Sequence, residues 1–249
     1  MIVEELERQQ LIKVADLSEH LGVSEVSIRR DLQRLEELGL LKRVHGGAVA
    51  TSNAPLGESF SAKIRAQAEK KERIGAAAAK MICKGDHLIL DSGTTPLQVA
   101  KHISAELLDS GNLTVITASL PIVHELGRRK GVHLILLGGI YLPEYEVVAG
   151  PQTIEHLKGL HADKMFLGTD GMTFSQGLTT ANVLEAEVDR AMVAASTEVI
   201  VVSDSSKIGG IGLATIMPLA RIHKLITDTD APPDFVATLQ DQGVQVLLV

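Results

Sequence analysis

The chain has 249 residues, 45% of them hydrophobic and 22% charged, which is typical of globular proteins, excludes disorder over most of the chain and predicts two domains. The formal net charge of −7 excludes a protein that is basic as a whole, and 2% aromatic residues without Trp argue against base-stacking surfaces for RNA. There is no apolar run of the roughly 18 residues that a membrane helix needs, and the first residues are acidic, unlike those of a signal peptide. The one cysteine forms no internal disulfide. We therefore expect a cytoplasmic protein without a membrane partner.

The first 50 residues predict two short helices joined by a tight turn. A helix over residues 15–21 ends at Gly22, and Ser24 is a suitable N-cap for a second helix that runs to Leu38. Apolar residues of the second helix recur three and four positions apart, so they share one face. Two such helices form a helix-turn-helix, and the polar start of the second helix suits the major groove of DNA.

Residues 40–48 predict a small hairpin, or wing, that contacts the DNA backbone. The candidate DNA-binding residues lie off the apolar stripe of the second helix or on this wing: Ser24, Glu25, Ser27, Arg29, Arg30, Arg34, Lys42, Arg43 and His45. Within residues 29–47 five Lys/Arg face three Asp/Glu, a local charge of +2. The alternative is an ordinary helical hairpin with solvated charges, which does not account for a wing at this distance.

Two segments of this region are similar to a known family. Ser24-Glu25-Val26-Ser27-Ile28-Arg29-Arg30-Asp31-Leu32 and Gly39-Leu40-Leu41-Lys42-Arg43-Val44-His45-Gly46-Gly47-Ala48 closely resemble the winged helix of DeoR-family bacterial transcription regulators. The resemblance implies double-stranded operator DNA as a partner, a homo-oligomer (dimer or tetramer) and, most often, a repressor. Family members usually carry a basic stretch ahead of the first helix, and this sequence lacks that stretch. Here we expect the first helix over about residues 2–10.

The middle of the chain predicts a linker followed by an α/β domain. Residues 51–59 are polar with Pro55 and Gly57, and we expect a linker over 51–70 between domains of residues 1–50 and 71–249. A helix is expected over Phe60 to Cys83, with Cys83 a small core residue. Strands are expected at residues 87–91, 113–117, 132–137, 164–168, 198–203, 224–227 and 244–248. Apolar strands separated by helices predict a Rossmann-like α/β domain with a mostly parallel sheet, so the fold class is α/β with a small winged helix-turn-helix in front.

The loop Asp91-Ser92-Gly93-Thr94-Thr95-Pro96 follows a predicted strand and opens a helix. With Thr95 as the cap, it offers backbone N–H groups, hydroxyls and a helix dipole to a phosphate, although a plain well-capped turn is the alternative. Further polar residues are expected where other strands end: Thr117, Ser119, Asp170, Gly171, Thr179, Thr180, Glu185 and Lys207. Ligands of α/β sheets bind at the carboxyl ends of strands, so these residues predict one crevice in which Lys207, unless it is a solvated surface lysine, pairs with a phosphate.

Residues 71–249 resemble the sensor domain of the same family, which is similar in fold to ribose-5-phosphate isomerases and binds phosphorylated sugars. The resemblance implies that Asp91 to Thr95 form the phosphate loop, Gly168 to Gly171 a second loop, and Asp204 to Lys207 an aspartate–lysine segment. Thr117-Ala118-Ser119 departs from the usual Thr-Asn-Ser and loses an amide. The segment from Lys207 to Val249 is most like members that govern amino-sugar or hexitol catabolism.

The sequence therefore predicts a transcriptional regulator, most often a repressor, of a carbohydrate catabolism operon, with DNA binding controlled by a phosphorylated sugar. We expect no catalytic residues, no metal and no cofactor, since no Cys/His set has metal-ligand spacing and no Walker or Gly-x-Gly-x-x-Gly loop is present. The alternative is a sugar-phosphate isomerase-like enzyme with an appended DNA-binding module, for which Asp170, Glu185 and Lys207 supply titratable groups. A catalyst has no need of residues 1–50, whereas a purely structural protein leaves the polar loops unexplained.

Overall fold

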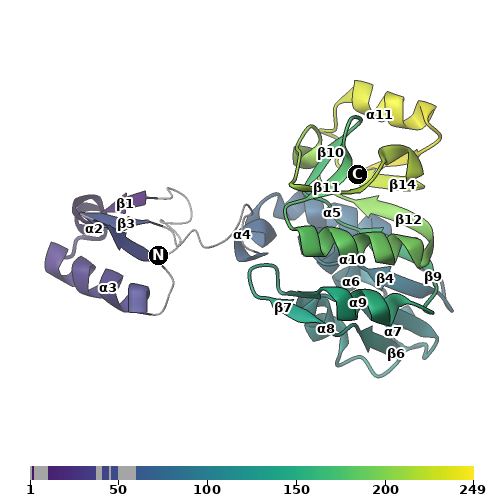
Figure 1. The fold of residues 1–249 in the computed structure, drawn as a ribbon, viewed down its shortest axis with the longest axis horizontal. Helices are drawn as coiled ribbons and strands as arrows, with labels where there is room; N and C mark the ends of the chain where they lie inside the picture. Colours follow the sequence, from purple (N-terminus) through teal and green to yellow (C-terminus); the bar gives the residue numbers. More distant parts are fainter. Residues whose placement is uncertain (1, 3–10, 38–40, 45, 50–59) are drawn as a thin grey trace. The chain divides into compact units, whose positions relative to one another are not determined.

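A computed structural model describes residues 2, 11–37, 41–44, 46–49 and 60–249 of the chain. The chain divides into two compact units, Met1–Pro55 and Leu56–Val249, each of which is described by itself (Figure 1). None of the helices in the described part of the chain is both long enough and apolar enough to span a bilayer.

The first unit has a helix-turn-helix and a small sheet. Helix α2 (Val14–Leu21) ends at Gly22, whose φ of 64° places it in the left-handed region that glycine adopts without strain. Helix α3 (Glu25–Glu37) follows, and its Ser27 N–H donates to the Ser24 hydroxyl at 3.3 Å. Strands β1 (Leu11–Lys13), β2 (Lys42–Val44) and β3 (Gly47–Val49) pair antiparallel in the order β1-β3-β2.

This arrangement confirms the predicted helix-turn-helix and wing, because β2 and β3 form the expected hairpin. Strand β1 was not predicted, since three residues are too few to show a periodicity. The core of the unit consists of Ile12, Val14, Leu17, Ile28, Leu32, Leu41 and Ala48. Leu38, Gly39 and nearly all of the helix expected over residues 2–10 lie outside the described residues.

The second unit is built on a seven-stranded sheet in the order β15-β14-β12-β9-β4-β5-β6 (Figure 1). All of its neighbouring strands pair parallel. Its strands are β4 (His87–Leu90), β5 (Leu113–Thr117), β6 (Val132–Leu136), β9 (Ala162–Leu167), β12 (Ser196–Val202), β14 (Lys224–Thr227) and β15 (Gln245–Leu248). These are the seven strands that the apolar runs predict, with ends that differ by at most two residues, and the parallel sheet is confirmed.

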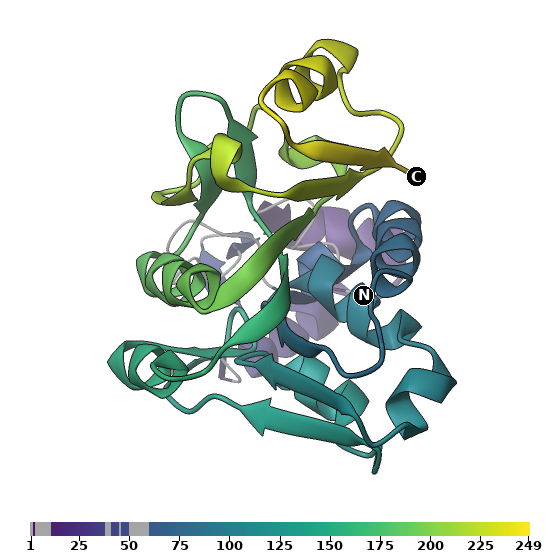
Figure 2. The same ribbon diagram turned by 90° about the vertical axis from the view of Figure 1, so that its right-hand side faces the viewer.

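Helices cover both faces of this sheet. Residues of α5 (Ala68–Ala79), α6 (Thr94–His102), α7 (Ala105–Asp109) and α8 (Leu120–Leu126) share one hydrophobic cluster with Leu88, Leu90 and Phe166. Residues of α9 (Pro151–Leu157), α10 (Val183–Ala194) and α11 (Pro233–Asp241) share the other with Ile89, Met165 and Leu167. Figure 2 shows α9 and α10 (green) on one side of the sheet and α5 and α6 (blue) on the other.

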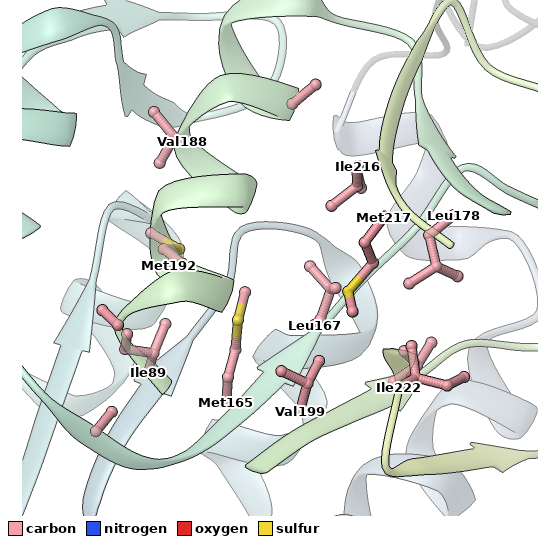
Figure 3. Close-up of a cluster of buried hydrophobic side chains, with 14 of the residues drawn as sticks. Ile89, Met165, Leu167, Leu178, Val188, Met192, Val199, Ile216, Met217 and Ile222 are labelled. Atoms are coloured by element: carbon pink, nitrogen blue, oxygen red, sulfur yellow. The ribbon is translucent and has the colours of Figure 1, made fainter. Parts of the chain in front are cut away.

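Alternate residues of one strand therefore enter opposite clusters, as the two-residue period of a strand requires. Figure 3 shows one of these clusters, in which Ile89, Met165, Leu167 and Val199 of the sheet lie near Val188 and Met192 of α10. Burial on both faces explains why the strands are apolar throughout rather than alternating.

Smaller elements complete the unit. Strands β10 (Gly171–Thr173), β11 (Gly177–Thr180) and β13 (Ala214–Met217) form an antiparallel sheet, and β7 (Ile140–Leu142) pairs with β8 (Val147–Ala149). Two short 3-10 helices are η1 (Ser205–Lys207) and η2 (Leu219–Arg221). Apart from the polar loops that contain parts of them, these elements were not predicted from the sequence.

The structure differs from the predicted 51–70 linker. Residues 60–65 form helix α4 (Phe60–Arg65), and α5 begins at Ala68, so both belong to the second unit. The physical reason is that Phe60 is buried in the same cluster as α5 and α6. The single helix expected over residues 60–83 is interrupted at Gln67, where φ is 54°, and Cys83 is exposed rather than a core residue.

Candidate functional site

The polar face of α3 is exposed along its length. Ser24, Glu25, Ser27, Arg29, Arg30 and Arg34 are exposed, as is Arg43 on β2, while Ile28 and Leu32 on the opposite face are fully buried. The Arg29 guanidinium lies 2.6 Å from the Glu25 carboxylate, an exposed pair that stabilises the helix weakly. His45 and the side chain of Lys42 lie outside the described residues.

The wing is joined to α3 by a backbone contact. The N–H of Arg43 donates to the Glu36 carboxylate at 2.8 Å, which fixes the start of β2 beside the end of the helix. Arg30 and Arg34 are one helical turn apart, so both lie on the exposed side of α3. The arrangement presents several guanidinium groups on one surface, as phosphate and guanine contacts in DNA require.

A cleft opens at the carboxyl ends of β4, β9 and β12 in the second unit. Counted to its open mouth, it contains about 680 Å³ of empty space. Nine of the predicted effector-binding residues line it: Asp91, Ser92, Gly93, Thr94, Thr95, Asp170, Thr180, Glu185 and Lys207. They come from the loop after β4, the first turn of α6, the loop after β9, β11, α10 and η1, so segments far apart in sequence meet here.

Helix α6 points its amino terminus at this cleft. The helix begins at Thr94, one residue before the predicted capping position, and Gly93 precedes it with a φ of 109° that favours glycine. The prediction that Thr95 caps the helix is therefore wrong. Thr94 and Thr95 are buried in its first turn and line the cleft. The positive end of the helix dipole and the first-turn N–H groups attract anions.

Three carboxyl groups lie close together at the base of the cleft: Asp91, Glu185 and Asp189. The Asp91 carboxylate accepts hydrogen bonds from the N–H of Ser92 (2.6 Å) and of Gly168 (3.0 Å). Burial nevertheless raises the pKa of Asp91 to about 6. Burial, with the negative charges of Asp91 and Asp170, raises the pKa of Glu185 to about 8. Burial also raises the pKa of Asp189, and Asp91 beside it adds to the rise.

At neutral pH, Glu185 is therefore mostly protonated, and the cluster holds fewer negative charges than it has carboxyl groups. The Ser92 hydroxyl lies 3.3 Å from the Glu185 carboxyl. An ionised carboxylate accepts from hydroxyl groups and a protonated carboxyl group also donates to them, so the cluster suits a polyhydroxylated ligand. No group of three or more His, Cys, Asp or Glu side chains among the described residues is arranged to hold a metal ion.

Three lysines, Lys63, Lys71 and Lys207, line the same cleft. The ammonium group of Lys63 lies 2.5 Å from the Asp170 carboxylate and 5.7 Å from the centre of the Tyr145 ring. Burial opposes ionisation of Asp170, but the charge and hydrogen bond of Lys63 outweigh it and lower the pKa of that carboxyl. The Lys71 ammonium donates to the backbone oxygen of Lys63 at 2.5 Å.

The loop that carries Lys207 is fixed by an ion pair below it. Asp228 is fully buried and accepts from the N–H and the hydroxyl of Ser205, at 2.6 and 2.9 Å. Lys70 of α5 lies 2.9 Å from the same carboxylate. Burial opposes ionisation of Asp228, but the Ser205 N–H and Lys70 lower its pKa to about 2. The loop between β12 and η1 is thus held in place before any ligand arrives.

The remaining four predicted effector residues are not in the lining of the cleft. Thr117 and Ser119 are buried, and the Thr117 hydroxyl accepts from the Ser119 N–H at 3.1 Å. The Thr179 hydroxyl donates to the Gly171 oxygen and accepts from the Gly212 N–H at 2.8 Å. These contacts join loops beside the cleft, so the four residues hold those loops together and do not line the cleft.

Several lining residues were missed by the sequence analysis: Phe60, Lys63, Lys71, Tyr145 and Asp189. Phe60 and Lys63 fell within the expected linker, and Asp189 lies one helical turn after Glu185 on the same face of α10. That spacing is the one signal that pointed to Asp189. Ser203 and Asp204 also line the cleft, and Asp204 opens the aspartate–lysine segment that the family resemblance implied.

Comparison with known proteins gives matches along nearly the whole chain. Residues 1–54 match the family described as a DeoR-like helix-turn-helix domain, and residues 66–229 match the DeoR C terminal sensor domain. The uncharacterized HTH-type transcriptional regulator YulB of Bacillus subtilis is 35% identical over 100% of this chain and 94% of its own length. The transcriptional repressor AccR of Agrobacterium fabrum is 35% identical over 92% of this chain and 87% of its own.

A third relative is the glycerol-3-phosphate regulon repressor of Escherichia coli, 30% identical over 99% of this chain and 96% of its own length. Among solved structures, ribose 5-phosphate isomerase A of Methanocaldococcus jannaschii aligns with a TM-score of 0.43 at 14% identity, over 57% of this chain and 55% of that one. A likeness of that size carries no argument about activity.

Proposed function

The chain belongs to the DeoR family of transcriptional regulators, and from that premise we propose that it is the repressor of a carbohydrate catabolism operon, released from DNA by a phosphorylated sugar. The first unit binds double-stranded operator DNA through the exposed face of α3 and the wing. The second unit binds the effector in the cleft at the carboxyl edge of its sheet.

The observation that carries this proposal is the composition of the cleft. One part of it offers an anion site, made by the amino terminus of α6 and the lysines Lys63 and Lys207. Another part offers the carboxyl groups of Asp91, Glu185 and Asp189, which pair with hydroxyl groups. A sugar phosphate has both kinds of group in one small molecule, whereas an unphosphorylated sugar leaves the anion site empty.

The first test is a thermal-shift screen against phosphorylated pentoses, hexoses, amino sugars and hexitols, each beside its unphosphorylated parent. A ligand at about a hundred times its dissociation constant adds roughly 2.7 kcal/mol to the free energy of unfolding, which gives a measurable rise in Tm. We expect a rise with one phosphorylated compound and none with its parent. A panel without any shift would remove the support for a sugar-phosphate site.

The division of labour between the units is tested by two substitutions. We expect Arg30→Ala to weaken operator binding without changing the effector Kd, because Arg30 is exposed on α3. We expect Thr94→Ala to weaken effector binding without changing operator affinity, because Thr94 lines the cleft. If either substitution changed both affinities equally, or only unfolded the protein, this assignment would fail.

An isomerase-like enzyme is the alternative, and the raised pKa of Glu185 is the observation in its favour, since a carboxyl group with a pKa of about 8 suits proton transfer near neutral pH. We propose that the protein is not an enzyme, because its curated relatives are transcriptional regulators along their whole length. An assay of aldose–ketose conversion with the effector found in the screen separates the two readings. Turnover above background would favour the enzyme.

We further propose a cytoplasmic homo-oligomer, either a dimer or a tetramer. Helix-turn-helix proteins usually read two half-sites with two copies, so a single winged helix gives only half of an operator contact. Apolar side chains stay exposed at the β6 edge of the sheet and on β7, namely Ile135, Leu136, Ile140 and Tyr141. Light scattering after size exclusion measures the assembly, and a monomer at operator-binding concentrations would contradict this proposal.

A further inference from the structure

Helix α4 reaches into the ligand cleft with one charged side chain. Lys63 and Asp170 form an ion pair at 2.5 Å, and their side chains are only 18% and 21% exposed. Lys63 lies on α4, whereas Asp170 belongs to the loop that connects β9 to β10, 107 positions further along the chain. The pair therefore fastens α4 to the wall of the cleft.

Asp170 has other hydrogen-bond partners besides Lys63. The second oxygen of Asp170 accepts from the Thr180 hydroxyl at 3.2 Å and from the Ala181 N–H at 3.0 Å. Asp170 therefore keeps two hydrogen bonds when Lys63 leaves it, and its loop stays in place. Loss of Lys63 does not strand a buried, unsatisfied carboxylate, which lowers the free-energy cost of breaking the pair.

Helix α4 is a short element that depends on its contacts with the rest of the unit. It is six residues long, and a helix of that length has little stability in isolation. The N–H of Phe60 donates to the Glu144 oxygen at 2.9 Å, and Lys71 donates to the backbone oxygen of Lys63. The buried ring of Phe60 and the partly buried side chain of Ile64 pack against the cluster that α5 and α6 share. The pair of Lys63 with Asp170 is a contact through which a ligand in the cleft can act on α4.

In chain order, α4 lies between the DNA-binding unit and the rest of the second unit. It is the first described element after the wing strand β3 of the DNA-binding unit. A ligand alters DNA binding only if it favours one arrangement of the protein over another, so some element must respond to occupancy of the cleft. Helix α4 both lines the cleft and leads, along the chain, to the winged helix.

We propose that Lys63 is an effector contact that exchanges Asp170 for the anionic group of the bound ligand, and that this exchange releases α4 from the cleft wall. The inference rests on the proposed function, since it needs an anionic ligand in this cleft. Asp170 is fixed to the sheet through its loop, whereas the ligand is only bound to the cleft. Exchanging one for the other therefore loosens α4 and carries the state of the cleft to the segment that precedes it.

The test is hydrogen–deuterium exchange of the full chain with and without inorganic phosphate, at constant ionic strength set with chloride. In the wild-type protein we expect phosphate to speed exchange in peptides over residues 60–66, on the order of tenfold. Lys63→Met and Asp170→Asn should show the fast exchange without phosphate and no further change with it. Arg73→Met, which removes an exposed charge from the neighbouring helix α5 outside the lining, should behave like the wild type.

Phosphate binding is measured separately by calorimetry on the same proteins, so that the two proposals fail differently. Binding of phosphate with unchanged or slower exchange over residues 60–66 would overturn the exchange of partners and leave the proposed function standing. Retention of the phosphate response in Lys63→Met would also overturn it. If the wild type binds neither phosphate nor any phosphorylated sugar, both proposals are overturned.

Discussion

At the scale of single residues, the most informative group is Glu185. It is only 8% exposed and shares its surroundings with two acidic side chains, Asp91 and Asp189. Its pKa is about 8 in the folded protein against an ordinary value of 4.5. Between these two pH values the folded state holds a proton that the unfolded chain has lost.

The sign of the resulting pH dependence follows from linkage. The stabilisation by this proton is complete below about pH 4.5 and is lost as the pH rises through 8. For one proton, the free energy of unfolding falls by about 1.4 kcal/mol per pH unit in that window. We expect Glu185→Gln to flatten this dependence between pH 5 and 8, as measured by urea unfolding at a series of pH values.

Glu187, exposed on the same helix, supplies the matched control. Glu187→Gln should retain the wild-type slope, because Glu187 is exposed and lies outside the lining of the cleft. A wild-type protein whose stability rises from pH 5 to 8 would contradict the proton held at Glu185. Asp91, with a pKa of about 6, adds to the slope only in the lower part of the window, and Asp189, whose pKa burial also raises, adds slope of the same sign in both proteins.

At the scale of elements, the contact between α5 and α6 depends on a glycine. A Cβ atom built on Gly75 would lie 2.5 Å from the Gln98 Cβ and 2.6 Å from its carbonyl carbon. Alanine in a helix interior usually stabilises by about 0.5–1 kcal/mol relative to glycine. Here the backbone of α6 blocks the added methyl group, so the clash reverses the sign.

We expect Gly75→Ala to lower the free energy of unfolding by roughly 1–3 kcal/mol, the usual cost of overpacking a core. Because the amino terminus of α6 is part of the proposed effector site, we expect the same change also to weaken effector binding. Chemical denaturation gives the first quantity and calorimetry the second. Arg73→Ala, at an exposed position of α5, controls for helix propensity. A Gly75→Ala protein as stable as the wild type would show that the two helices are not in close contact.

The elements also show what sequence reasoning reached. The seven strands of the parallel sheet were predicted because each is a short apolar run, which burial on both faces explains for the five inner strands. Strands β7, β8, β10, β11 and β13 have three or four residues each, and their pairing partners, not their composition, make them strands. The helix-turn-helix was predicted because caps and apolar spacing are local signals.

The candidate site also contains residues that the sequence predicted and residues that it did not. The loop from Asp91 to Thr95 was found because phosphate-binding loops have a local pattern of small and hydroxyl residues after a strand. Lys63 was not found, because its role arises from an ion pair with a residue 107 positions away. A lysine in a helix next to a polar linker has the composition of a solvated surface. Only the tertiary contact distinguishes it.

At the scale of the whole molecule, the net charge of the chain and the local charge of the DNA-binding region have opposite signs. The chain carries a net charge of −7, yet residues 29–47 hold five basic residues against three acidic ones. A protein that is acidic overall gains little from non-specific attraction to DNA, so we expect binding to depend on the few guanidinium groups of α3 and the wing. Small changes in how the winged helices are presented therefore have large effects on operator affinity.

The two binding reactions must then influence each other equally. If the effector weakens operator binding by some factor, the operator weakens effector binding by the same factor, and typical couplings are about 5- to 150-fold.

We expect calorimetric titration of the effector to give a higher Kd in the presence of saturating operator DNA. The ratio should equal the rise in operator Kd that saturating effector produces. Lys63→Met should reduce both ratios together, because it removes the proposed link between the units as well as one effector contact. An effector that binds the cleft and leaves operator affinity unchanged would show that the two units act independently, whereas one that strengthens operator binding would reverse the sign of regulation.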